Sequence, residues 1–172
     1  MDSNLLFKVK GYLCALADVM SLFKGSYIYS FDFIKLGNSL NAEEAVKEFL
    51  SNPDFLVNRH NIFNPRLEKC YSWEKGLLDT INRWFFNDIA FSESTIGYYE
   101  SEDREKISLN SMLEFNYIAK GLLENIKNFF GESETSVFKL VMEEAERDEF
   151  AWEQYVFEVN SYVYILQFYR QG

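Results

Sequence analysis

The sequence predicts an all-α fold, a single-domain helical bundle of about four long helices with short connecting helices. Apolar residues recur at spacings of three and four along segments of roughly twenty residues, which is the pattern of amphipathic helices. The connections between these segments are short, and the 172 residues contain no internal repeat, low-complexity tract or interdomain linker. A chain of this length buries roughly 70% of its unfolded surface, so residues 1–172 are expected to form one domain.

The first predicted helix runs from Asp2 to Lys24. Asp2 or Ser3 can cap its start, and Gly25 stands where the helix should end. The apolar positions of its buried stripe are Leu5, Leu6, Val9, Leu13, Leu16, Met20 and Phe23. Their spacing brings them to one side of the helix, which is expected to face the core.

The sequence after this helix is less regular. The stretch from Ser26 to Gly37 fits either a short helix or an edge strand. Asn41, followed closely by two glutamates, predicts a short capped helix that ends near Asn52-Pro53. The stretch from Pro53 to Cys70 contains both prolines of the chain, and we expect a loop with one or two helical turns there.

Two further long helices are predicted, from Ser72 to Phe91 and from Ser108 to Phe130. Ser72 is a candidate N-cap of the first, and Gly131 closes the second. The stripe of the first is Trp73, Leu77, Ile81, Trp84, Phe85 and Ile89, and that of the second is Met112, Phe115, Ile118, Leu122, Ile126 and Phe129. Antiparallel packing of such stripes is typical of a bundle.

The last segment can be interpreted in two ways. Tyr155 to Tyr169 is rich in Tyr, Val and Phe, and its alternation fits a hairpin that turns at Asn160-Ser161. A helix instead explains why polar residues repeat at sevens opposite an apolar side, and no Gly or Pro interrupts Ser133 to Gln171. The polar set is Glu146, Glu153, Asn160 and Gln167, and the apolar set is Trp152, Val156, Val159, Val163 and Leu166. We favour one long helix, with an α+β fold carrying a C-terminal hairpin as the alternative.

Composition indicates a globular protein of the cytoplasm. Hydrophobic residues make up 48% of the chain and charged residues 26%, so the hydrophobicity is too high for disorder. The start, Met1-Asp2-Ser3-Asn4, lacks the basic region of a secretory signal, and no uncharged apolar stretch is long enough to span a bilayer. Cys14 and Cys70 have no metal-binding spacing and are expected to be two buried thiols.

The sequence contains no catalytic, cofactor or metal motif. His60 is the only histidine, and a catalytic relay would have to be built around it, but it stands in a polar stretch typical of a surface loop. A di-iron site needs a Glu-x-x-His on each of two helices, and the chain has no second histidine. The glycines form no phosphate-binding loop. Glu143, Glu146 and Glu149 would share one face of a helix, which fits a solvated or protein-binding face better than a cation site. We therefore expect a protein that is not an enzyme and needs no cofactor.

The net charge of the whole chain is −10, and its acidic residues are concentrated in the C-terminal half. Residues 1–92 carry 11 acidic against 10 basic side chains, whereas residues 93–172 carry 16 against 7. The surplus forms two acidic runs, the first with Glu100, Glu102, Asp103 and Glu105, the second with Glu143, Glu144, Glu146, Asp148 and Glu149. Such a chain should repel nucleic acid and anionic membranes, so either the expected partner is a basic protein or there is none.

The expected contact residues combine these acids with neighbouring aromatics. Tyr98 and Tyr99 precede the first run and could act as aromatic anchors, because such residues commonly carry binding energy. The alternative is that this stretch is only a polar loop. The expected set is Tyr98, Tyr99, Glu100, Glu102, Asp103 and Glu105, together with Glu143, Glu144, Glu146 and Glu149.

In its overall character the chain resembles the immunity proteins of bacterial polymorphic toxin systems, including those of contact-dependent growth inhibition. The features that carry the resemblance are small size, acidity, richness in aromatics and helices, and the absence of motifs. The resemblance implies a cytosolic, stoichiometric inhibitor that binds a toxic nuclease domain and mimics the charge of its nucleic-acid substrate. The alternative function is an acidic adaptor or regulatory module that binds other proteins through its aromatic surface.

Overall fold

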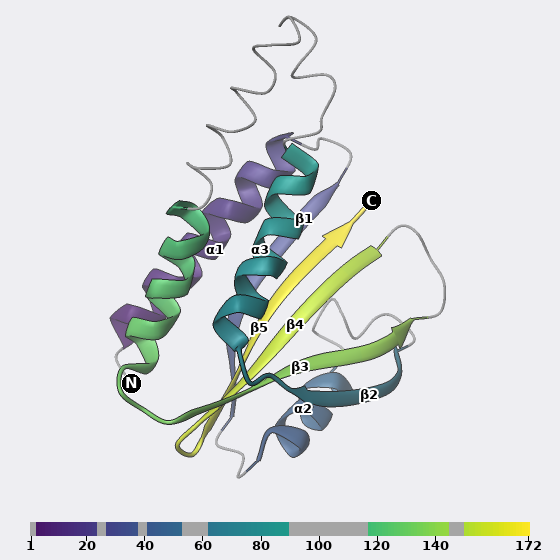
Figure 1. The fold of residues 1–172 in the computed structure, drawn as a ribbon. Coiled ribbons are helices and arrows are strands. Elements are labelled where there is room, and N and C mark those ends of the chain that lie inside the picture. Colours follow the sequence, from purple (N-terminus) through teal and green to yellow (C-terminus); the bar gives the residue numbers. More distant parts are fainter. Residues whose placement is uncertain (1–2, 24–26, 38–40, 53–61, 90–116, 145–149) are drawn as a thin grey trace, which may run out of the picture.

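Five antiparallel strands form one sheet, in the order β1-β5-β4-β3-β2, in the computed structural model (Figure 1). The structure describes residues 3–23, 27–37, 41–52, 62–89, 117–144 and 150–172. The elements are α1 (Ser3–Phe23), β1 (Ile28–Gly37), α2 (Ala42–Ser51), β2 (Ile62–Lys69), α3 (Trp73–Ile89), β3 (Thr135–Glu144), β4 (Phe150–Val159) and β5 (Tyr162–Gln171). A further helix covers residues 117–130.

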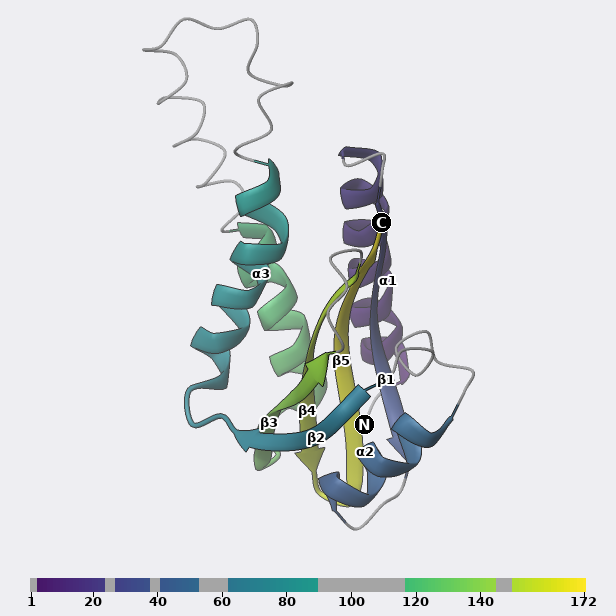
Figure 2. The ribbon, with the colours of Figure 1, turned by 90° about the vertical axis from the view of Figure 1, so that its right-hand side faces the viewer.

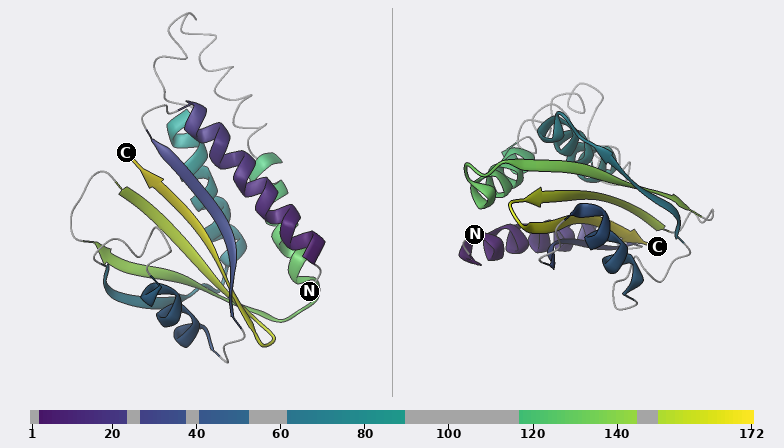
Figure 3. Two further views of the ribbon diagram at one scale, coloured as in Figure 1. Left: turned by 180° about the vertical axis from the view of Figure 1, so that it is seen from behind. Right: turned by 90° about the horizontal axis from the view of Figure 1, so that it is seen from below.

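Helices lie on both faces of the sheet (Figures 2 and 3). On one face, α1, α3 and the helix of residues 117–130 bury a large core against the strands. On the opposite face, α2 buries a smaller core through Val46 and Phe49. The larger core is unusually aromatic: the ring of Phe33 stacks on Tyr164 with centroids 5.5 Å apart and meets Phe157 edge-on. The fold is therefore α+β, and the prediction of an all-α bundle is wrong.

The predicted long C-terminal helix is replaced by the strands β3, β4 and β5. The hairpin alternative is correct, because Val159 pairs with Tyr162 and Asn160 takes the positive φ of 55° that a tight turn needs. The helical pattern misleads because β4 and β5 are inner strands covered on both faces. Successive residues such as Ile165 and Leu166 are both fully buried, one in each core, so the alternation that reveals a half-buried strand is lost.

The other helix predictions agree with the described residues. The helix predicted over residues 2–24 is α1, and the one predicted over residues 72–91 is α3. Asn41 caps α2 by accepting a hydrogen bond from the backbone N–H of Glu44 at 2.8 Å, and the helix ends at Ser51. Of the helix predicted over residues 108–130, the described part from residue 117 onward is helical.

The two edge strands come from the less regular part of the sequence. The stretch from Ser26 to Gly37 contains β1, in agreement with the edge-strand alternative. The loop predicted before Cys70 is wrong over residues 62–69, which form β2. Pro65 is tolerated there because β2 is at the edge and its register shifts between Phe63 and Arg66.

The prediction of two buried thiols is also wrong. Cys14 is exposed on the outer side of α1, and Cys70 is half-buried. His60 lies outside the described residues. No helix in the described part of the chain is long and apolar enough to cross a membrane.

Candidate functional site

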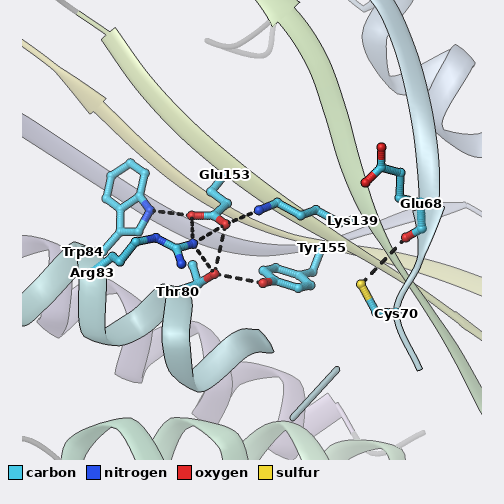
Figure 4. A network of polar contacts seen from close by, with 8 residues as sticks. All are labelled: Glu68, Cys70, Thr80, Arg83, Trp84, Lys139, Glu153 and Tyr155. Atoms are coloured by element: carbon cyan, nitrogen blue, oxygen red, sulfur yellow. Dashed lines mark hydrogen bonds and ion pairs between the residues drawn. The ribbon is translucent and has the colours of Figure 1, made fainter. Parts of the chain in front are cut away.

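A polar cluster centred on Glu153 lies between α3 and the sheet (Figure 4). The Arg83 guanidinium donates to both carboxylate oxygens of Glu153, at 2.7 and 2.9 Å. The Lys139 ammonium donates to Oε1 at 2.6 Å, and the indole N–H of Trp84 donates to Oε2 at 3.1 Å. The hydroxyl of Thr80 lies 3.0 Å from Oε1. One carboxylate therefore joins α3 to the strands β3 and β4.

The helix and the strands both place these side chains by simple periodicity. Thr80, Arg83 and Trp84 stand at i, i+3 and i+4 of α3, so they lie on one face of the helix. Glu153 lies two residues before Tyr155 on β4, and therefore on the same, helix-covered face of the sheet. Lys139 lies on the neighbouring strand β3, directly opposite Tyr155 of β4. This pairing brings the ammonium group of Lys139 within reach of Glu153.

The electrostatics of the cluster keep Glu153 ionised. Its side chain is only 11% exposed, against 52% for Arg83 and 38% for Lys139. Burial desolvates the Glu153 carboxylate and by itself raises the pKa, but the hydrogen bonds from Lys139 and Arg83 outweigh it, so the pKa is lowered. Two cations and one anion leave this cluster with a net charge of +1, with the carboxylate as its least exposed charge.

Two further titratable groups border the cluster, and both stay protonated. The hydroxyls of Tyr155 and Thr80 are 2.8 Å apart, and burial raises the pKa of Tyr155. Burial also raises the pKa of the Cys70 thiol, whose Sγ donates weakly to the carbonyl of Glu68 at 3.7 Å. A nucleophilic thiol needs a lowered pKa and a general base needs a pKa near neutrality. Here the pKa of Cys70 is raised, and the pKa of Tyr155 is shifted further from neutrality, so neither group meets its requirement.

The pattern of hydrogen bonds fits an anchor between helix and sheet. The two carboxylate oxygens of Glu153 together accept bonds from four side chains, so little of the carboxylate is left to bind a substrate. Among the described residues, no group of three or more His, Cys, Asp or Glu side chains could hold a metal ion. The cluster is best explained as a structural device.

Most of the predicted contact residues lie outside the described part of the chain. This applies to the whole first set and to two members of the second, namely Tyr98, Tyr99, Glu100, Glu102, Asp103, Glu105, Glu146 and Glu149. Glu143 and Glu144 are the last two residues of β3. Their backbones pair with Phe63 and Ile62 of the edge strand β2. The expectation that Glu143, Glu146 and Glu149 share a helix face is wrong for Glu143, which belongs to a strand.

Sequence reasoning missed the Glu153 cluster. It assigned Glu153 to the solvated stripe of a helix, whereas the side chain is nearly buried against α3. A signal was present: Glu153 and Lys139 are single charges of opposite sign, each inside an apolar run of the sequence. Such a pair predicts an ion pair across two strands. The part played by α3 has no comparable signal.

A separate groove lies on the other face of the sheet, between α2 and β2. Its volume is about 650 Å³, and its walls combine apolar and charged side chains. The lining residues are Glu43, Val46, Lys47, Leu50, Ser51, Pro65, Arg66, Leu67 and Leu140. The charges are mixed in sign, so the groove does not select a ligand of one charge.

Comparison with known proteins gives no relative from which a role could be transferred. No protein-family model, no curated protein and no solved structure matches the chain.

Proposed function

We propose that this chain is a stoichiometric protein inhibitor, an immunity protein that binds a basic toxin in the cytoplasm and neutralises it. The toxin domain is a nuclease in this proposal. The observation that carries the proposal is the charge distribution: residues 93–172 hold 16 acidic against 7 basic side chains, while the rest of the chain is nearly balanced. A basic nuclease surface attracts such a chain over a long range, as it attracts its own substrate.

The fold supports this proposal through the place of the second acidic run. Glu143 and Glu144 end β3, and the run continues into the connection between β3 and β4. Glu143 and Glu144 pair with β2, which is the edge strand of the sheet. Acidic residues next to an edge strand discourage pairing with other acidic copies and leave a basic partner free to approach.

The Glu153 cluster supports a role without catalysis. Its carboxylate has a lowered pKa and is therefore a weak base, and its neighbouring phenol and thiol have raised pKa values and therefore stay protonated, so none of the three is tuned for proton transfer or attack at neutral pH. An inhibitor needs a rigid scaffold and a complementary surface, and the cluster supplies rigidity.

Charge reversal tests the proposal, provided that each acidic run is compared with an equal change of charge elsewhere in the chain. In each of three variants, three glutamates are replaced by lysine. The first variant changes Glu100, Glu102 and Glu105, the second changes Glu143, Glu146 and Glu149, and the control changes the exposed Glu124, Glu132 and Glu134. Affinity is measured by calorimetric titration against a panel of basic toxin nuclease domains. Reversal of a run that lies at the interface should weaken binding at least about tenfold, because desolvated charge pairs contribute several kcal/mol. The control should change it less than about threefold.

Salt gives an independent measurement. Raising the ionic strength from 0.1 to 1 M shortens the screening length from about 10 to about 3 Å, so a steered association should slow strongly. If the panel yields a tight complex that survives reversal of both runs, the charge argument is refuted. If no nuclease in the panel binds, the toxin-neutralising function loses its support.

One observation favours the second candidate function, an adaptor that binds proteins through aromatic residues. Tyr71, in the turn before α3, is 89% exposed, and Tyr117, at the start of the helix of residues 117–130, is 78% exposed. Exposed tyrosines supply contact area at low entropic cost. An adaptor of this kind predicts binding that is insensitive to salt and is lost when Tyr71 and Tyr117 are changed to serine, with the acidic runs left intact.

A further inference from the structure

Helix α1 has two apolar faces, and only one of them is covered by the rest of the described fold. Val9, Leu13 and Met20 are fully buried against the sheet. The opposite side, here called the outer face of α1, consists of Phe7, Lys8, Gly11, Cys14, Ala15, Asp18, Val19 and Leu22, all exposed. Figures 2 and 3 show α1 at the outside of the fold, next to β1.

The composition of the outer face is unusual for a surface helix. Such a helix normally carries charged and polar residues on the side away from the core. Here Phe7 is 70% exposed, Leu22 is 84% exposed and Val19 is 41% exposed, and the only two charges are Lys8 and Asp18. An apolar helix face of this kind, left uncovered by the described residues, is typical of an interaction surface.

The charge of α1 decides which partner fits. The whole helix carries Lys8, Lys10 and Asp18, a net charge of +1 in a chain of net charge −10. A basic partner would gain nothing from this helix. A second copy of the acidic chain would find here an interface without acidic surplus, where self-repulsion is small.

We propose that the outer face of α1 is a homodimer interface, in which α1 of one copy packs antiparallel against α1 of a second copy. The residue pattern is self-complementary about the midpoint between Cys14 and Ala15. In an antiparallel pair with that centre, Phe7 lies opposite Leu22 and Gly11 lies opposite Asp18. A two-fold interface requires this property, because each contact occurs twice.

The two charges of the outer face support the same arrangement. Lys8 stands one helical turn from Gly11, so the antiparallel pairing brings Lys8 of one copy near Asp18 of the other, twice. Lys10 is not part of this contact, because its ammonium group already pairs with Asp32 at 3.3 Å. The small side chains of Gly11 and Ala15 near the centre let the two helices approach closely.

The size of the interface sets the strength of the dimer. A helix of 21 residues is about 31 Å long, so a single pair of helices covers less than the about 800 Å² per partner of a standard interface. The dimer should therefore be reversible, with a dissociation constant in the micromolar range.

Sedimentation velocity on the full chain tests the inference, at concentrations from about 1 to about 200 µM. The weight-average mass should rise from the chain mass of 20.3 kDa toward twice that value. Phe7→Glu with Leu22→Glu should hold the protein at the monomer mass. The matched control, Tyr71→Glu with Tyr117→Glu, replaces two other exposed apolar residues and should leave the association unchanged.

Two further measurements separate a specific antiparallel pair from general stickiness. Asp18→Lys should weaken the association about tenfold, and Asp18→Lys combined with Lys8→Asp should restore it, because the second change rebuilds the opposite charges. Mild oxidation should form a disulfide between Cys14 of one copy and Cys14 of the other, in the wild type and in Cys70→Ser. The Cys14→Ser variant should form no such cross-link.

A monomer at all concentrations overturns the inference, and so does a dimer that persists in the Phe7→Glu, Leu22→Glu variant. Neither result depends on the toxin-binding proposal, because no partner is present in these experiments. Binding of a partner by the acidic runs should in turn be unaffected by the substitutions in α1.

Discussion

Replacing Glu153 with glutamine tests whether its carboxylate anchors α3 to the sheet. Glutamine has the same shape but no charge, and its amide NH₂ cannot accept the hydrogen bonds that one carboxylate oxygen receives. Arg83 and Lys139 would keep their positive charges without the anion between them. We therefore expect Glu153→Gln to fold and to be less stable than the wild type.

The size of the loss follows from the exposure of the partners. Breaking a fully buried ion pair costs about 3–5 kcal/mol, and breaking an exposed one costs at most about 1 kcal/mol. Glu153 is 11% exposed, but Arg83 at 52% and Lys139 at 38% can regain water, so the cost lies between these limits, at about 2–3 kcal/mol. For a chain of this size that corresponds to a fall in Tm of about 4–12 °C.

Denaturant titration and thermal melting measure the change, with Glu68→Gln as the matched control. Glu68 pairs with Arg66 at 3.0 Å, but both side chains are more than half exposed, so its loss should cost less than about 1 kcal/mol. Equal stability losses for the two variants would refute the anchoring role of Glu153.

The pH dependence of the same difference has a definite sign. The folded-state pKa of Glu153 lies below the ordinary glutamate value of 4.5, so the fold favours the ionised form. Its contribution is complete above pH 4.5 and is lost as the pH falls through the lowered pKa. The gap between wild type and Glu153→Gln should therefore be constant near neutrality and close in acid; a gap that widens in acid would contradict the assignment.

Three other outcomes are expected. Phe33→Ala should lose about 3–5 kcal/mol in denaturant titration, because the ring is fully buried among other aromatics; a loss below about 1 kcal/mol would contradict its central place. Gly131→Ala should lose about 1–2 kcal/mol by the same assay, because residue 131 holds a φ of +60°, and an unchanged stability would argue against that backbone. Cys14 should react with iodoacetamide at pH 8 faster than Cys70, whose pKa is raised by burial, as mass spectrometry of Cys14→Ser and Cys70→Ser can show; equal rates would count against the burial of Cys70.

The sequence predicted the elements whose burial is one-sided. The helix α1 was found because Val9, Leu13 and Met20 recur on one side, and α2 because Asn41 is a strong cap. The inner strands β4 and β5 were misread because both of their faces are covered, which removes the period of two. Which faces are covered is a property of the tertiary arrangement, and no local pattern reports it.

The candidate site was less accessible to prediction than the fold. The charge surplus could be counted, but the part of the chain that carries most of it lies outside the described residues. The Glu153 cluster joins residues 70 positions apart, Arg83 and Glu153, and depends on how α3 crosses the sheet. The apolar character of the outer face of α1 was not noticed in the sequence, because the buried stripe was enough to predict the helix.

The order of the strands has a consequence for the way the molecule is made. Strand β5 follows every other strand in the chain, yet it lies between β1 and β4. During synthesis β1 emerges first and has no neighbour until Tyr162–Gln171 has left the ribosome. Strands β2, β3 and β4 can pair with one another earlier, but β1 cannot join the sheet until β5 has emerged, and a nascent chain stalled before that point holds an open β1 that chaperones are suited to protect.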